Sequence, residues 1–181
     1  MKDEARILDA TAGNRFIWKT KETPFIIWGD IEPDLEYKPD QIIDCTQTDF
    51  PDKYFHTIFF DPPHSWGREK NAGIFTTPSK KVSDEKWPSH KRTRPRYYGL
   101  DKFKSKTALL GFINKAQKEF YRILQDGGAL WFKWCEIHST SEAILPIFQN
   151  WVEMLRINAS PIGRSKNKTV WIMLMKVHSC T

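Results

Sequence analysis

Short apolar runs that alternate with turns and helical patterns constrain the fold of this chain more than any other feature. We expect strands at residues 6–10, 24–28, 41–45, 57–60, 129–134 and 169–176. We expect helices at residues 15–19, from 105 to about 124, and at about 141–155. This alternation predicts an α/β fold with a mostly parallel sheet and helices on both faces. The closing strand is expected to be antiparallel to its neighbour, because only a short polar turn precedes it.

The second expected helix has the clearest pattern. It begins near Ser105, and its apolar positions recur every three or four residues, at Leu109, Phe112, Ile113, Ala116, Phe120, Ile123 and Leu124. The glycines of Asp126-Gly127-Gly128 are suited to end it. The run that follows, 129–134, is almost wholly apolar, as is typical of a strand buried on both faces. The third helix is expected to have Thr140 or Ser141 as its N-cap.

The length of 181 residues predicts one domain, 1–181, with a sizeable core. No apolar run approaches the roughly 18 residues that span a bilayer, and the first six residues do not begin a signal peptide. Three distant cysteines fit reduced thiols better than a disulfide framework, and five scattered histidines predict no structural metal. We therefore expect a cytoplasmic protein without membrane contact.

Positive charge is concentrated in one segment. The formal net charge is +6, yet residues 67–108 hold twelve Lys or Arg and four acids, a balance of +8. The rest of the chain holds 16 basic and 18 acidic residues, a balance of −2. Such a segment fits a polyanion, most plausibly nucleic acid, and it equally fits a solvated loop.

Polar residues and glycines follow the expected strands at their carboxyl ends, where ligands bind in open α/β sheets. The first strand runs into Asp9-Ala10-Thr11-Ala12-Gly13, and its glycine lets backbone approach a ligand closely. Asp30 ends the second strand 21 residues after Asp9, close to the spacing at which an acid meets ribose hydroxyls. Asp49-Phe50 follows the third strand, and Asp61-Pro62-Pro63-His64 closes the fourth. Four such sites in order predict one ligand site.

The Asp61-Pro62-Pro63-His64 turn resembles the Asp-Pro-Pro-aromatic motif of amino-methyltransferases, which use S-adenosylmethionine (SAM) to methylate amines such as those of adenine and cytosine. Residues 6 to 177 are similar to small class I SAM-dependent methyltransferases of bacteriophage and prophage genomes. The segments that carry this resemblance are Asp9 to Trp18, Gly29-Asp30-Ile31, Lys38-Pro39-Asp40, the Asp-Pro-Pro-His turn, Tyr98-Gly99, Phe132 to Glu136, Trp171 and Met175-Lys176. The chain departs from the pattern at Cys135, which replaces Asn, and in a longer segment after His64.

The resemblance implies a Rossmann-like class I methyltransferase fold, with a mostly parallel seven-stranded sheet and an antiparallel last strand. It also implies SAM as the cofactor, with Asp49-Phe50 at the adenine ring. The cofactor-binding residues that we expect are Asp9, Ala10, Thr11, Gly13, Arg15, Asp30, Ile31, Asp49, Phe50 and Asp61.

The Asp-Pro-Pro-His turn suits the methylation of an amine. An aromatic amine is a poor nucleophile because its lone pair is delocalised into the ring. The Asp61 carboxylate and the Pro62 carbonyl can hold its two N–H bonds and favour a tetrahedral nitrogen, while Pro62 and Pro63 stiffen the turn. His64 can stack on the base, donate a hydrogen bond or take up the released proton. Asp61, Pro62, Pro63 and His64 are the expected catalytic residues.

A basic substrate loop is expected at about 65–104, where cations that can meet phosphates alternate with rings that can stack on bases. The expected substrate-binding residues are Lys91, Arg92, Arg94, Arg96, Tyr97, Tyr98, Lys133 and Trp134. Lys133 has an alternative role, an ion pair with Glu136. These residues favour a nucleic-acid base as the acceptor, adenine N6 first and cytosine N4 next, with DNA ahead of RNA. The alternatives are RNA, a protein amide, a small molecule or a non-catalytic subunit, and a specificity partner or homodimer is compatible with a chain of this size.

Overall fold

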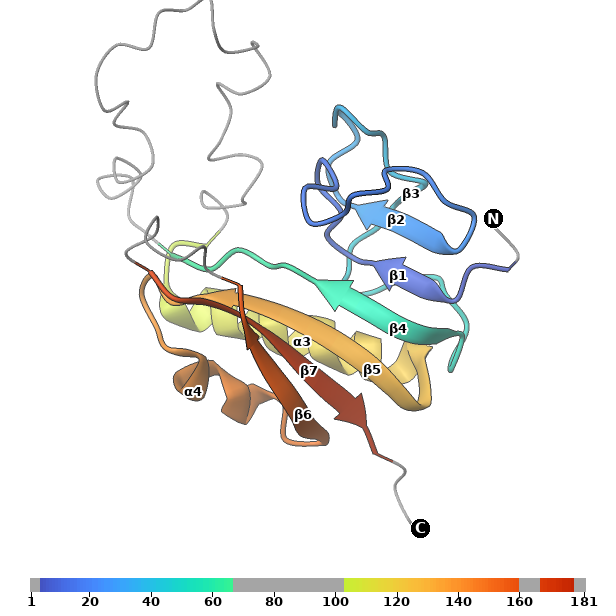
Figure 1. Cartoon of the computed structure of the whole chain (residues 1–181). Helices are drawn as coiled ribbons and strands as arrows, with labels where there is room; N and C mark the ends of the chain where they lie inside the picture. Colours follow the sequence, from blue (N-terminus) through green and yellow to red (C-terminus); the bar gives the residue numbers. More distant parts are fainter. Residues whose placement is uncertain (1–3, 67–102, 160–166, 178–181) are drawn as a thin grey trace, which may run out of the picture.

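A computed structural model describes residues 4–66, 103–159 and 167–177 (Figure 1). Its seven strands are β1 (Ile7–Asp9), β2 (Ile26–Asp30), β3 (Gln41–Ile42), β4 (Phe55–Phe60), β5 (Leu124–Cys135), β6 (Trp151–Asn158) and β7 (Thr169–Lys176). They form one sheet in the order β3-β2-β1-β4-β5-β7-β6. The strands from β3 to β5 are parallel, and β7 is antiparallel to both of its neighbours. The predicted mixed seven-stranded sheet is therefore confirmed.

The helix with the clearest sequence pattern is confirmed as α3 (Lys106–Ile123). The Ser105 side chain caps it by accepting a hydrogen bond from the Ala108 N–H at 3.2 Å. The predicted end at the two glycines is wrong, because Leu124 already has the extended conformation that starts β5. Gly127 instead provides a left-handed residue, with φ of +74°, inside β5.

Of the two other predicted helices, the first is wrong and the second is confirmed only at its start. Residues 15–19 form turns, and Arg15 has a φ of +55°, which a right-handed helix cannot contain. The helix predicted over 141–155 is only α4 (Ser141–Ile144) followed by the 3-10 helix η4 (Leu145–Ile147). Pro146 lies in that short helix and cannot donate the hydrogen bond that a longer α-helix needs. The chain then enters β6, which pairs with β7 along its whole length.

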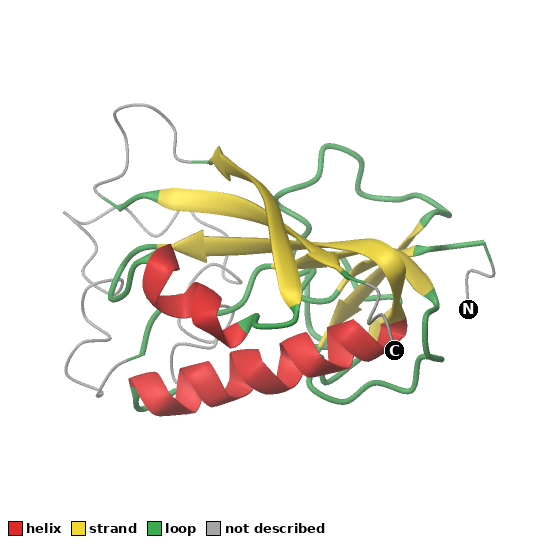
Figure 2. Cartoon of the chain, turned by 90° about the horizontal axis from the view of Figure 1, so that it is seen from below, coloured by secondary structure: helices red, strands yellow, loops and turns green. Residues whose placement is uncertain are grey.

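Both described α-helices lie on the same face of the sheet (Figure 2). On that face the side chains of Phe60, Phe132 and Ile172 are fully buried, and Phe60 contacts Phe120 of α3 with ring centroids 4.9 Å apart. This aromatic packing forms the main core of the domain.

The opposite face of the sheet is only partly covered. Trp131 stacks on Phe59 at a centroid distance of 6.2 Å, and Trp171 meets the same Phe59 ring edge-on at 6.0 Å. All three side chains are partly exposed, so the prediction that β5 is buried on both faces is wrong. Irregular segments follow β1 and β2, and Trp18 packs there against Phe59 and Trp28. Among the described residues, the expected helices are thus found on one face only.

Two smaller expectations concern membranes and thiols. Within the described ranges, none of the helices has the length and apolar character to span a membrane. Cys45 is buried and Cys135 is half-buried, and neither of these two described cysteines forms a disulfide.

Gly128 has no room for a side chain, which gives a test of the β4–β5 packing. A Cβ there would lie 2.9 Å from the carbonyl oxygens of both Gln125 and His56. We expect Gly128→Ala to lower the free energy of unfolding by about 1–3 kcal/mol, because backbone atoms must shift. Gly111→Ala, in open space on α3, should instead raise it by about 0.5–1 kcal/mol. Urea denaturation measures both, and equal stabilities of the two variants would contradict this packing.

Candidate active site

The loop after β1 is tied to the end of β2. One Asp30 carboxylate oxygen accepts a hydrogen bond from the Gly13 N–H at 2.8 Å, and the other accepts from the Glu32 N–H at 2.9 Å. Gly13 has a φ of +49°, which favours glycine. The Ala12 N–H also donates to the Gly29 carbonyl at 2.9 Å. A carboxylate offers acceptor sites for more than two hydrogen bonds, so its position beside this loop suits a ligand hydroxyl.

Asp9 lies beneath this loop and is 1% exposed. Its carboxylate accepts hydrogen bonds from the Trp18 indole N–H at 2.7 Å and from the Thr11 N–H at 3.3 Å. Burial raises the pKa of Asp9 to about 7, although both hydrogen bonds act in the opposite direction. Asp9 therefore supports the loop from below in this structure.

A hydrogen bond joins the β1 loop to the Asp-Pro-Pro-His turn. The Asp61 N–H donates to the Thr11 hydroxyl at 2.8 Å, and the Ala10 N–H donates to the Phe59 carbonyl at 2.9 Å. Pro62 is buried and Pro63 is half-buried. The carboxyl ends of β1, β2 and β4 thus form one continuous site, at the point where the strand order reverses.

The Asp61 carboxylate is shared by two side chains. One oxygen lies 3.0 Å from His64 Nε2, and the other lies 2.6 Å from Lys133 Nζ. Burial acts to raise the pKa of Asp61, but the hydrogen bond from His64 and the charge and hydrogen bond of Lys133 outweigh it, so the pKa is lowered. Asp61 is therefore an anionic acceptor at neutral pH.

His64 is held with one ring nitrogen on Asp61 and the other without a partner in the described part of the chain. Its side chain is 12% exposed, and its ring meets Trp134 edge-on at a centroid distance of 5.3 Å. Nδ1 is buried and has no hydrogen-bond partner. If Nε2 carries the proton donated to Asp61, Nδ1 is a free acceptor.

Lys133 pairs with Asp61, and not with Glu136 as the alternative interpretation required. Glu136 instead accepts hydrogen bonds from the Ser141 N–H at 3.0 Å and the Ser141 hydroxyl at 2.7 Å. The prediction that Trp134 binds substrate is wrong for this structure. Its side chain is fully buried, and its indole N–H donates to the Ser139 carbonyl at 2.9 Å.

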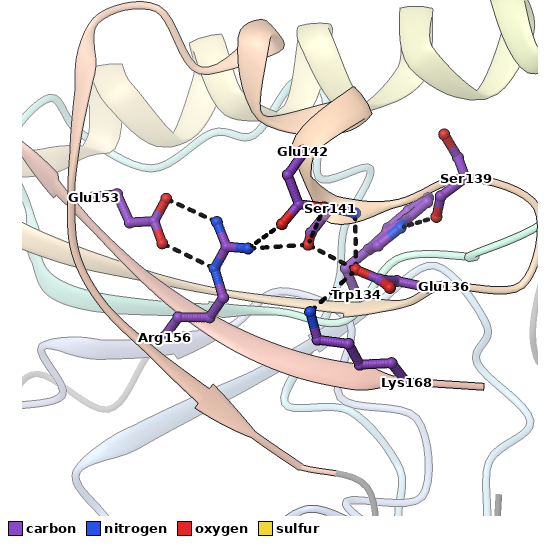
Figure 3. A network of polar contacts seen from close by, with 8 residues as sticks. All are labelled: Trp134, Glu136, Ser139, Ser141, Glu142, Glu153, Arg156 and Lys168. Atoms are coloured by element: carbon purple, nitrogen blue, oxygen red, sulfur yellow. Dashed lines mark hydrogen bonds and ion pairs between the residues drawn. The ribbon is translucent and has the colours of Figure 1, made fainter. Parts of the chain in front are cut away.

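A polar network fixes the chain just beyond Lys133 (Figure 3). Arg156 of β6 binds the carboxylates of Glu142 and Glu153, at 2.5 and 2.9 Å, and also contacts the Ser141 hydroxyl. Lys168, which precedes β7, lies 3.8 Å from Glu136. The network joins the ends of β5, α4, β6 and β7, so it holds the carboxyl end of β5 in place.

The Arg15 side chain binds two neighbouring loops of the protein. Its guanidinium donates to the Lys38 carbonyl at 2.7 Å and to the Lys21 carbonyl, and it lies 4.6 Å from the centre of the Trp28 ring. Arg15, Trp28 and Lys38 line a cleft of about 710 Å³ beside β2. Arg15 therefore holds two loops together in this structure, and its role in cofactor binding stays a prediction.

Asp49 and Phe50 lie at the opposite edge of the sheet from Asp30. Phe50 is buried in the core, and its carbonyl accepts from Arg122 at 2.8 Å, in the last turn of α3. That turn leads into the start of β5, which is the amino edge of the parallel strands. The predicted adenine contact at Asp49-Phe50 is therefore corrected.

The sequence interpretation missed Asp44, which follows β3 closely. Its neighbour Ile43 donates its N–H to the Asp30 carbonyl at 2.9 Å, so Asp44 lies next to the end of β2. The signal was an acid directly after an apolar strand, and it was overlooked because the strand was expected to continue to Cys45. Ile31, which follows Asp30, is 53% exposed at the same edge, as a residue that contacts a ligand should be.

Some expected residues cannot be placed. Most of the basic segment lies outside the described residues, including Lys91, Arg92, Arg94, Arg96, Tyr97 and Tyr98. Within the residues that are described, no group of three His, Cys, Asp or Glu side chains is arranged to hold a metal ion.

Solved structures match the fold, although no family model and no curated protein matches the sequence. A TehB-like SAM-dependent methyltransferase of Corynebacterium glutamicum has a TM-score of 0.53 at 12% identity, over 96% of this chain and 80% of that one. The N-methyltransferase NodS of Bradyrhizobium japonicum has 0.54 at 12%, over 96% and 86%. An rRNA methylase of Streptococcus thermophilus has 0.50 at 15%, over 97% and 89%. The chain therefore has the Rossmann-like class I methyltransferase fold.

The raised pKa of Asp9 makes stability depend on pH. The folded protein keeps a proton on Asp9 that the unfolded chain loses near its ordinary pKa of 3.8, so this residue lowers stability as pH rises from about 4 to about 7. We expect the free energy of unfolding of Asp9→Asn, relative to that of wild type, to rise by roughly 2–4 kcal/mol across that pH range. Urea denaturation at pH 4, 5, 6 and 7 measures the difference. The exposed Asp34→Asn is the control, and parallel curves for Asp9→Asn and wild type would refute the assignment.

Proposed function

We propose that this protein is a SAM-dependent methyltransferase that acts on an exocyclic amine of a nucleic-acid base. Adenine N6 is the favoured acceptor and cytosine N4 the next, with DNA ahead of RNA. The observation that carries the proposal is the hydrogen bond between Asp61 and Thr11, which joins the Asp-Pro-Pro-His turn to the Gly13–Asp30 loop. A cofactor bound by that loop would have its reactive end close to the Asp61 carboxylate.

The residues at the ends of β1, β2 and β3 fit SAM, which supplies a methyl group on a sulfonium when bound. Asp30 ends β2 as an acid, which suits ribose hydroxyls, and Gly13 leaves backbone accessible. Exposed Ile31 offers an apolar surface to the adenine ring, and Asp44 takes the position that Asp49 was expected to hold.

Asp61 and His64 divide the work on the acceptor. The Asp61 carboxylate and the Pro62 carbonyl hold the N–H groups, so that the nitrogen lone pair is free for the methyl group. The nitrogen gains the methyl group and loses one proton. His64, whose Nε2 lies 3.0 Å from Asp61, can take up that proton, and the Trp134 contact fixes its ring. This geometry favours proton transfer by His64 over stacking on the base.

Nucleic acid is favoured by charge and by exposed rings. The basic segment follows the Asp-Pro-Pro-His turn directly in the sequence. On the open face of the sheet, Trp171 lies beside Lys133, with Nζ 5.8 Å from its ring centre, and Trp131 is also partly exposed. Such rings can stack on bases. One structural neighbour is named an N-methyltransferase and another an rRNA methylase, which are names compatible with this proposal.

Transfer of labelled methyl groups tests the function. Purified protein and labelled SAM are incubated with separate pools of DNA, RNA and protein, and the labelled nucleosides or amino acids are identified. We expect label in DNA, on adenine N6. Label confined to RNA or to protein would replace the acceptor, and no transfer together with SAM binding would favour a non-catalytic subunit.

Variants of two acids at this site should separate cofactor binding from methyl transfer. Asp61→Ala should abolish transfer and leave SAM bound, because its carboxylate acts on the acceptor and its N–H bond to Thr11 is retained. Asp30→Ala should weaken SAM binding by roughly 1–3 kcal/mol, through loss of hydrogen bonds to a charged group. Calorimetry and single-turnover assays measure the two effects. Normal transfer by Asp61→Ala would refute the mechanism.

A further inference from the structure

The Asp61 carboxylate is already compensated by a cation. Lys133 Nζ lies 2.6 Å from one oxygen, and His64 Nε2 lies 3.0 Å from the other. The Asp61 and Lys133 side chains are each 23% exposed, so the pair is only partly screened by water. An acceptor that enters the site therefore meets both a carboxylate and the ammonium group of Lys133.

We propose that Lys133 is a specificity-determining residue that restricts the methyl acceptor to an uncharged nitrogen, such as a base amine or an amide, and excludes alkylammonium groups. This inference rests on the proposed function and names the acceptor class of the same site. Lys133 was expected to meet a phosphate or Glu136, and its contact with Asp61 gives it a different role.

The first reason is like-charge repulsion. A neutral amine can share the free lone pairs of Asp61 with Lys133 at no electrostatic cost. An alkylammonium at the same carboxylate would place a second cation within a few Å of Lys133 Nζ. In a partly buried site such a pair is repelled strongly enough to change affinity by at least about tenfold.

The second reason is proton transfer. An alkylammonium must lose a proton before its nitrogen can attack, whereas an aromatic amine already has its lone pair. The contacts with His64 and Lys133 lower the pKa of Asp61, which makes this carboxylate a poor base for an ammonium group. The site is suited to a nitrogen that becomes acidic only as it is methylated.

Three variants test the role of Lys133. Lys133→Met removes the charge and keeps much of the side-chain volume, and Lys133→Arg keeps the charge. Lys168→Met removes an exposed lysine at the same end of the sheet that pairs with Glu136 and does not contact Asp61. A residue with a merely structural role would change stability or overall rate in Lys133→Met, and would leave acceptor preference unchanged.

Acceptor preference is measured with two matched oligonucleotides. One carries adenine at the target position, and the other carries a base analogue with a primary alkylamine there. We expect the ratio of kcat/KM for the alkylamine over adenine to stay low in wild type, Lys133→Arg and Lys168→Met. Lys133→Met should raise the ratio of kcat/KM for the alkylamine over adenine by at least about tenfold. An unchanged ratio would overturn the proposal.

A second readout does not require transfer. SAM carries a sulfonium charge that S-adenosylhomocysteine lacks, so the ratio of their affinities reports the charge beside the sulfur. Lys133→Met leaves Asp61 uncompensated, and calorimetry should show this ratio shift at least threefold towards SAM. Lys133→Arg and Lys168→Met should retain the wild-type ratio. An unshifted ratio in Lys133→Met would also refute the proposal.

Failure of the inference is distinguishable from failure of the function. If wild-type protein binds SAM and methylates adenine, and Lys133→Met has an unchanged acceptor preference, only the proposed role of Lys133 is refuted. Wild-type protein that does not bind SAM loses the proposed function, and the acceptor proposal is refuted with it.

Discussion

One hydrogen bond, from the Asp61 N–H to the Thr11 hydroxyl, connects the two halves of the candidate site. On one side lies the loop that Asp30 holds through Gly13, and on the other lies the stiff Asp-Pro-Pro-His turn. Both segments follow buried parallel strands, so neither can move without disturbing the sheet. Two functions that need a fixed separation, holding a donor and presenting an acceptor, therefore depend on contacts between adjacent strands.

The sheet is packed unequally on its two faces, and this affects the site. Beneath it, Phe60 and Phe132 are buried in a dense aromatic core with α3. Above it, Phe59, Trp131 and Trp171 are only partly covered, and Lys133 projects from the same face as Trp131 because alternate residues of a strand share a face. The rigid face fixes the strand ends, and the open face leaves room for a large acceptor.

The sequence predicted what depends on local periodicity. The final strand was predicted with its correct bounds, and the start of α3 near Ser105 followed from its apolar spacing. The strand β6 was mistaken for helix because its apolar residues are exposed on a sheet edge, where neither period is strict. Pro146 was the available warning.

The site was predicted in part, because the end of a strand can be recognised from the local sequence. Contacts between side chains that are distant in sequence cannot be recognised in this way. Asp30 is the last residue of β2 and Asp61 follows β4 directly, so both lie at the strand ends where they were expected. The partner of Lys133 is 72 residues away in sequence, so only the β4–β5 register brings it to Asp61. Asp49-Phe50 was assigned to the wrong edge of the sheet because the third strand was expected to end at Cys45, whereas β3 ends at Ile42. The chain therefore has room to cross to the amino edge before it reaches Phe50, which contacts Arg122 there.

The outer edge of the sheet bears on how this protein behaves at high concentration. The edge strand β6 exposes four apolar side chains, Val152, Met154, Leu155 and Ile157, a composition that invites pairing with another chain. Two features oppose that pairing. The register with β7 is irregular between Glu153 and Leu155, and Glu153 and Arg156 place charges along the same edge. The irregularity and the charges make β6 a poor template for a further strand, so the edge resists fibrous aggregation despite its apolar surface.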